Sequence, residues 1–121
     1  MSVFLDLNDD DKIYIGVNFF LIKDRFPVSP GHILIISKKA RSDYFELSES
    51  EKISLPNLID KAKSIIEEQY QPDGYNIGMN CGSAAGQTVM HFHCHIIPRY
   101  KGDMADPRGG IRHAVEGKGY Y

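Results

Sequence analysis

Residues 91–97 read His-Phe-His-Cys-His-Ile-Ile, and this alternation of polar and apolar side chains constrains the local fold more than any other feature. Successive side chains of a β-strand point to opposite faces, so a strand here would bury Phe92, Cys94 and Ile96. The three histidines would project together from the other face, roughly 6.5–7 Å apart from one to the next. Histidine is costly to bury without a partner. Three in a row, with a fourth at His32, therefore predict a functional site.

The remaining hydrophobic pattern predicts strands on both sides of a helix. A turn separates two short strands in the region 13–22, and further strands are expected over residues 32–36, 75–80 and 89–97. The glycine-rich carboxy end is expected to be irregular.

Residues 48–51, Ser-Glu-Ser-Glu, have the spacing of a capping box, which predicts the start of a helix. Apolar residues at helical spacing then form one face that ends near Tyr70. Pro56 lacks an N–H and crowds the preceding turn, so the helix should be kinked or restarted there. The order of strands, helix and strands predicts a single α+β domain over residues 1–121, an antiparallel sheet with one long helix and a short helix.

The composition is that of an ordinary globular chain, with 42% hydrophobic and 25% charged residues, which argues against disorder. A net charge of −2 argues against nonspecific binding to nucleic acid. The first residues lack the pattern of a signal peptide, and no stretch approaches the ~18 apolar residues of a membrane helix. The two cysteines, Cys81 and Cys94, form no C-x-x-C pair and suit a reducing compartment. These features predict a soluble, cytoplasmic protein with neither a nucleic-acid nor a membrane partner.

Two chemistries use an array of imidazoles, namely metal binding and covalent catalysis. His-x-His on a strand can hold zinc, as in β-barrel metalloenzymes. Such a site usually includes a carboxylate a few residues later, and here no Asp or Glu follows the histidines until Asp103. The loop over residues 80–88 consists mainly of small residues whose N–H groups can turn toward an anion, and Gln87 and Thr88 add donors. Basic residues after the histidines would offset the charge of a polyphosphate; they are Arg99, Lys101, Arg108 and Arg112. These surroundings favour attack by an imidazole on phosphorus over metal binding.

The sequence resembles the histidine triad family. Residues 91–97 fit its pattern of three histidines separated by hydrophobic residues, and the likeness extends upstream through Asn80 and residues 85–89, Ala-Gly-Gln-Thr-Val. Asp24 and residues 27–32, Pro-Val-Ser-Pro-Gly-His, match the family's turn and fourth histidine. The segments after the histidines look more like the branch of dinucleoside-polyphosphate hydrolases, with the fragile histidine triad protein, than like the phosphoramidase branch.

The resemblance implies a hydrolase or transferase that cleaves at the α-phosphate of an adenine or other purine nucleotide, notably a dinucleoside polyphosphate, and releases AMP. It implies that His93 is the nucleophile and forms a covalent nucleotidyl intermediate. His95 would assist the leaving group, and His91 and His32 would hold the imidazoles in their tautomers. The implied substrate-binding residues are Asp24 for the ribose, Ile22 for the base, and Asn80, Gly86, Gln87 and Thr88 for the phosphate.

The resemblance also implies a homodimer whose sheets join, with a small-molecule nucleotide as substrate. No cofactor or bound metal is required, and a divalent cation such as Mg²⁺ would enter only with the polyphosphate. Two alternatives remain open within the same pocket: an AMP-phosphoramidate hydrolase and a non-catalytic sensor that binds purine nucleotides. A metalloprotein is a third alternative, and it would require stoichiometric zinc or iron.

Overall fold

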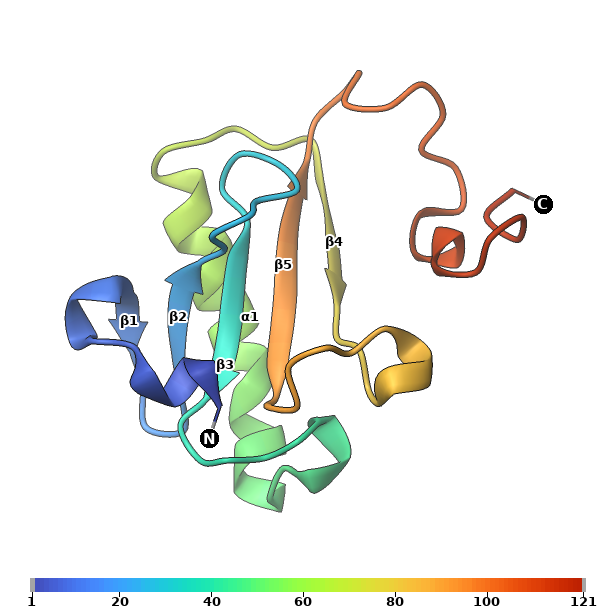
Figure 1. Ribbon diagram of the computed structural model, residues 1–121. Coiled ribbons are helices and arrows are strands. Elements are labelled where there is room, and N and C mark those ends of the chain that lie inside the picture. The colour runs from blue at the N-terminus through green and yellow to red at the C-terminus, as the bar shows by residue number, and fades with distance from the viewer. Residues whose placement is uncertain (1, 121) are drawn as a thin grey trace.

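The computed structural model describes residues 2–120 and forms a five-stranded antiparallel sheet with one long helix across one face (Figure 1). The strands follow the order β1-β2-β3-β5-β4, and each neighbouring pair is antiparallel. Their bounds are Lys12–Ile15 (β1), Phe19–Lys23 (β2), Ile33–Ser37 (β3), Gly74–Gly78 (β4) and His93–Arg99 (β5). The predictions of an α+β fold and an antiparallel sheet are confirmed.

The last strand begins later than its sequence pattern predicts. β5 starts at His93 instead of Val89, because the amide of Phe92 donates a hydrogen bond to the carbonyl of Arg41 (2.6 Å), outside the sheet. His91 therefore lies before the strand. The prediction that three histidines share one strand face is wrong in this respect, since only His93 and His95 project from β5.

The long helix, α1, spans Glu49–Glu67 and begins with the predicted capping box. The Ser48 hydroxyl accepts a hydrogen bond from the Glu51 amide (3.2 Å), and the Glu51 carboxylate accepts one from the Ser48 amide (2.6 Å). The helix continues through Pro56 without interruption, so the predicted restart is wrong, whereas a bend there stays a prediction. Within residues 2–120, α1 is the only α-helix. The other helical segments are short 3-10 helices; they span Val3–Asp6, Asp9–Asp11, Tyr44–Glu46, Ser83–Ala85 and Gly110–Ala114.

Both faces of the central strands are buried, but by different parts of the chain. On one face, Leu55, Ala62 and Ile66 of α1 pack against apolar side chains from β2, β3 and β5 and against Phe92, which precedes β5. On the other face, the cluster Phe20, Ile22, Leu34 and Ile36 is covered by Phe4 and Leu7 of the amino-terminal segment. His93 and His95 pair with Ile36 and Leu34 in the sheet register, so they belong to this second face.

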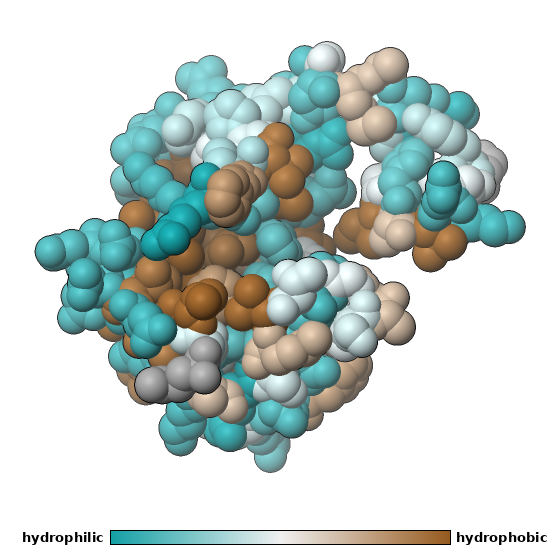
Figure 2. Space-filling view, viewed as in Figure 1, coloured by the Kyte–Doolittle hydropathy of each residue, from teal (hydrophilic) through white to brown (hydrophobic). Residues whose placement is uncertain are grey.

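The carboxy-terminal segment, residues 100–120, is irregular apart from one 3-10 turn, as expected. It stands beside β4, and Figure 2 shows an opening between it and the body of the molecule. No helix within residues 2–120 has the length and apolar character needed to cross a bilayer.

Candidate active site

The orientation of His93 is set by a backbone carbonyl. Its Nδ1 lies 2.8 Å from the carbonyl oxygen of His91. A carbonyl can only accept, so Nδ1 carries the proton and a neutral His93 has its lone pair on Nε2. The ring lies 5.3 Å from that of His95, centroid to centroid. His93 lines a pocket, and in its neutral form the nitrogen that can act as a nucleophile is Nε2.

His91 is buried, and it supports His93 through its backbone. Its Nε2 lies 2.7 Å from the carbonyl oxygen of Ser37 and 3.2 Å from that residue's hydroxyl, while its Nδ1 has no hydrogen-bond partner within residues 2–120. The imidazole of His91 thus anchors the turn before β5 to the end of β3. The carbonyl that fixes the tautomer of His93 is held in place by this anchor.

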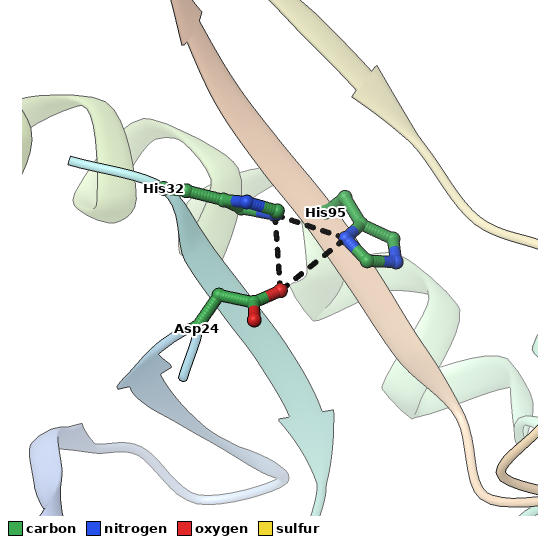
Figure 3. Close-up of side chains that lie close together, drawn as sticks. All are labelled: Asp24, His32 and His95. Atoms are coloured by element: carbon green, nitrogen blue, oxygen red, sulfur yellow. Dashed lines mark hydrogen bonds and ion pairs between the residues drawn. The ribbon is translucent and has the colours of Figure 1, made fainter. Parts of the chain in front are cut away.

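A second chain of hydrogen bonds ends at His95. The amide of Val28 donates to Nδ1 of His32 (3.1 Å), so a neutral His32 carries its proton on Nε2. That nitrogen lies 3.0 Å from Nδ1 of His95, which accepts a hydrogen bond from it. A neutral His95 therefore carries its own proton on Nε2. Figure 3 shows Asp24 facing both rings, with Oδ2 3.4 Å from His32 Nε2 and 3.9 Å from His95 Nδ1. His95 consequently presents a hydrogen-bond donor to a ligand.

Asp24, His32 and His95 place three potential ligand atoms within 4.8 Å of one another, which is close enough for a metal ion. The hydrogen bond from Val28 opposes that use, because it puts the proton of His32 on the nitrogen that would have to bind the metal. The donor set therefore fits a proton relay better than a metal centre, and a metal-free site stays a prediction.

The environment keeps both relay histidines neutral. Burial, followed by the proximity of His93 and His32, lowers the pKa of His95 to about 4, although the Asp24 carboxylate opposes the shift. Burial likewise lowers the pKa of His32. At neutral pH the two rings therefore act as uncharged donors and acceptors.

The pKa of His95 predicts acid sensitivity of the fold. Because folded His95 binds its proton more weakly than unfolded histidine, stability present above about pH 6.5 should be lost as the pH falls toward about 4, by at most about 3 kcal/mol. Chemical denaturation across this range should give a shallower pH slope for His95→Asn. His113→Asn, at an exposed histidine outside the site, should keep the wild-type slope. Equal slopes for His95→Asn and the wild type would contradict the assignment.

The histidines open on a pocket of about 450 Å³ between the amino-terminal segment, the end of β2 and the loop before β5. Ile22 and Leu34 contribute apolar side chains to its wall, and Asp24, Thr88 and His93 line it as well. Its remaining lining residues are Val3, Phe4, Leu7, Arg25, Phe26, Val89 and His95. The pocket thus combines an apolar slot, a carboxylate and an imidazole pair.

Several backbone amides of the loop before β5 form hydrogen bonds within the loop. Gly82 and Gly86 both have φ of 94°, a left-handed conformation that favours glycine. The amides of Ala85, Gly86 and Gln87 donate to the carbonyls of Gly82 or Ser83. These amides are therefore not free to form the anion nest that the small residues predict.

Gln87 is buried and holds the loop together. Its Oε1 accepts from the amide of Gly82 (2.8 Å), and its Nε2 donates to the carbonyls of Ser42 (2.6 Å) and Val89 (3.1 Å). Gln87 does not line this pocket, whereas its neighbour Thr88 does. These hydrogen bonds give Gln87 a positioning role, and its contact with phosphate stays a prediction.

Two other predicted phosphate residues lie near the pocket without lining it. Asn80 is exposed and borders a neighbouring cavity that His95 also lines. Gly86 is exposed, and a side-chain carbon built on it would lie 4.0 Å from the amide nitrogen of Asn80. The structure brings Asp24, Ile22, Thr88, His93 and His95 together in one pocket and leaves these two beside it.

None of the basic residues after the histidines lines this pocket. Arg99 binds both carboxylate oxygens of Asp103 and the side-chain oxygen of Asn76, on the side of β5 near the carboxy-terminal segment. Arg108 pairs with Asp106. The prediction that this basic group offsets polyphosphate charge at the histidines is therefore wrong for these two arginines. The only Lys or Arg that lines the pocket is Arg25.

Sequence reasoning also missed the amino-terminal wall. The ring of Phe4 lies 5.1 Å from that of His93 and 5.7 Å from that of His91, and it closes one side of the pocket. The sequence does contain a sign of this wall. Strands with uninterrupted apolar runs are buried on both faces, and a single helix covers only one face, so another segment has to cover the second.

The chain matches the HIT domain model over residues 7–102. It is 40% identical over 80 residues to the asymmetrical bis(5'-nucleosyl)-tetraphosphatase of Schizosaccharomyces pombe, which covers 66% of this chain and 44% of that protein. It is 37% identical over 85 residues to the bis(5'-adenosyl)-triphosphatase of Dictyostelium discoideum, covering 70% of this chain and 57% of that protein. The chain thus spans about half the length of these curated relatives.

The fold has a close counterpart among solved structures. A HIT family member from Bacillus subtilis superposes with a TM-score of 0.77 at 26% identity, covering 97% of this chain and 88% of that one. The family model spans the strands, the helix and all four histidines described above. The chain therefore belongs to the HIT domain family.

Proposed function

We propose that the protein hydrolyses dinucleoside polyphosphates at the α-phosphate, through a covalent nucleotidyl intermediate on His93, and releases AMP. The hydrogen bond from His93 Nδ1 to the His91 carbonyl carries the proposal, because it leaves the nucleophilic lone pair on Nε2 at the pocket. The choice of substrate draws support from the names of the tetraphosphatase and triphosphatase relatives.

The pocket suggests how such a substrate would lie. The purine would pack on the apolar side chains of Ile22 and Leu34, the ribose hydroxyls would bind the carboxylate of Asp24, and the α-phosphate would reach Thr88 and His93. An apolar slot that ends in a few polar groups is typical of a site for a small ligand.

The reaction would proceed in two displacements at phosphorus. His93 Nε2 attacks the α-phosphorus, a P–N bond forms, and the P–O bond to the β-phosphate breaks. His95 donates its Nε2–H to the departing oxygen, and His93 keeps its Nδ1 proton, which stays hydrogen-bonded to the His91 carbonyl. Water then attacks the phosphorus and gives a proton to Nε2 of His95, which restores the neutral imidazole. The nitrogen leaves with its bonding pair, and AMP and neutral His93 are released.

The proposal includes a homodimer joined through β4. This strand lies at the edge of the sheet, and Ile77 within it is 40% exposed. An exposed strand edge offers unpaired backbone groups to a second copy of the chain.

Incubation with diadenosine tri- and tetraphosphate, followed by mass spectrometry, tests the reaction. We expect AMP among the products and, in rapidly quenched samples, an AMP-sized adduct on the peptide that carries His93. Adenosine 5'-phosphoramidate is the comparison substrate, because it has the same α-phosphate. Turnover of the phosphoramidate alone would contradict the proposal and favour the alternative function, that of an AMP-phosphoramidate hydrolase. Binding of AMP without turnover of any substrate would contradict the proposal and favour the other alternative, a non-catalytic nucleotide sensor.

A further inference from the structure

Arg25 supplies the positive charge that the pocket would otherwise lack. It lies on the rim, directly after Asp24, and no other Lys or Arg lines the pocket. Its side chain is exposed and has no hydrogen-bond or ion-pair partner within residues 2–120. A guanidinium with all its donors available is well suited to bind phosphate oxygens.

A local turn fixes the place of Arg25. The amide of Phe26 donates to Oδ1 of Asp24 (2.8 Å), which folds the chain back directly after β2. The backbone of Arg25 lies inside this turn. Lys23, two residues earlier, borders a different cavity, which lies between α1 and the turn before β3. The two cations are therefore separated, and only Arg25 faces the site.

The charge balance of the pocket calls for such a cation. His32 and His95 are neutral, Asp24 is the pocket's carboxylate, and Arg99 and Arg108 are paired with carboxylates elsewhere. A polyphosphate leaving group carries several negative charges, whereas the ammonia released from a phosphoramidate carries none. Arg25 would therefore favour the first kind of substrate over the second.

Resting on the proposed function, we propose that Arg25 is a specificity-determining residue that binds the phosphates beyond the α-phosphate. It selects nucleotides whose leaving group is a polyphosphate over those whose leaving group is neutral. The contact strengthens as the P–O bond breaks, because negative charge then develops on the β-phosphate side.

The experiment compares Arg25→Gln with wild type, and Lys23→Gln is the matched control that removes a neighbouring charge outside the pocket. We expect Arg25→Gln to lower kcat/KM for diadenosine tetraphosphate by about tenfold, and by less at high salt. Its kcat/KM for adenosine 5'-phosphoramidate should stay within about twofold of wild type. Lys23→Gln should leave both values unchanged. An equal loss on both substrates, or a changed base preference with no dependence on the leaving group, would overturn the proposal.

A binding measurement keeps this test independent of turnover. Titration calorimetry with AMP and with α,β-methylene-ATP, which cannot be cleaved at the α-phosphate, should show that Arg25→Gln weakens only the second ligand. Equal weakening of both ligands would overturn the role of Arg25, whatever the catalytic result. A wild-type protein that turns over no substrate would overturn the proposed function alone.

Discussion

Replacing His93 with Ala is expected to lower the rate of AMP release from diadenosine tetraphosphate by about 10³-fold or more, because the variant has no nitrogen to attack phosphorus. The fold should persist, since His93 lies on the face of β5 away from the α1 core and its ring makes one hydrogen bond, to the His91 carbonyl. AMP should bind within a few-fold of wild type, because Ile22, Leu34 and Asp24 are unchanged.

Steady-state rates, circular dichroism and AMP titration together check this prediction. His113→Ala is the control, because that histidine lies outside the pocket and should be replaceable without loss of rate. The adduct on the peptide of residue 93 should disappear in His93→Ala. Comparable rates in the variant and the wild type would remove His93 from the mechanism and leave His95 or a bound water as the nucleophile.

Replacing Glu51 with Ala is expected to cost about 3 kcal/mol of unfolding free energy, because two interactions are lost together. The buried carboxylate caps α1 through the Ser48 amide and binds Nε of Arg41 at 2.9 Å. For a chain of this size the loss corresponds to a fall in Tm of roughly 10 °C. Activity should fall as well, since the carbonyl of Arg41 holds the amide of Phe92 beside the histidines.

The matched control for Glu51 is Glu49→Ala. Glu49 lies in the same first turn of α1, but it is exposed and no hydrogen bond joins its side chain to another described residue. Its removal should cost less than about 1 kcal/mol, the value expected for a charge near a helix amino terminus. Thermal melts of the two variants at neutral pH separate these effects. Equal destabilisation would mean that helix charge, and not the buried pair, is responsible.

The sheet and helix could be predicted from the sequence because their signals are local. The uninterrupted apolar runs of β2 and β3, and the capping box at Ser48, each identify an element within a few residues. The start of β5 could not be predicted in this way. It depends on a hydrogen bond between Phe92 and Arg41, which lie about fifty residues apart in the chain.

The identities of the site residues could be predicted better than their orientations. The motif selects Gln87, but only the fold shows that its amide is used by Gly82, Ser42 and Val89. The paired arginines were a different kind of error. Asp103 lies four residues after Arg99 and Asp106 two residues before Arg108, so local partners were available in the sequence.

The amino-terminal cover has a practical consequence for the preparation of this protein. Phe4 borders His93 and the pocket, so a purification tag or linker fused ahead of Ser2 would be tethered at the pocket's entrance. Such a fusion would obstruct nucleotides entering the pocket. The resulting rise in KM would be mistaken for weak intrinsic affinity. A tag at the carboxy end would be attached beyond residue 120, on the far side of β4 from the amino-terminal segment (Figure 1). Kinetic constants should therefore be compared between the two placements before any substrate is judged poor.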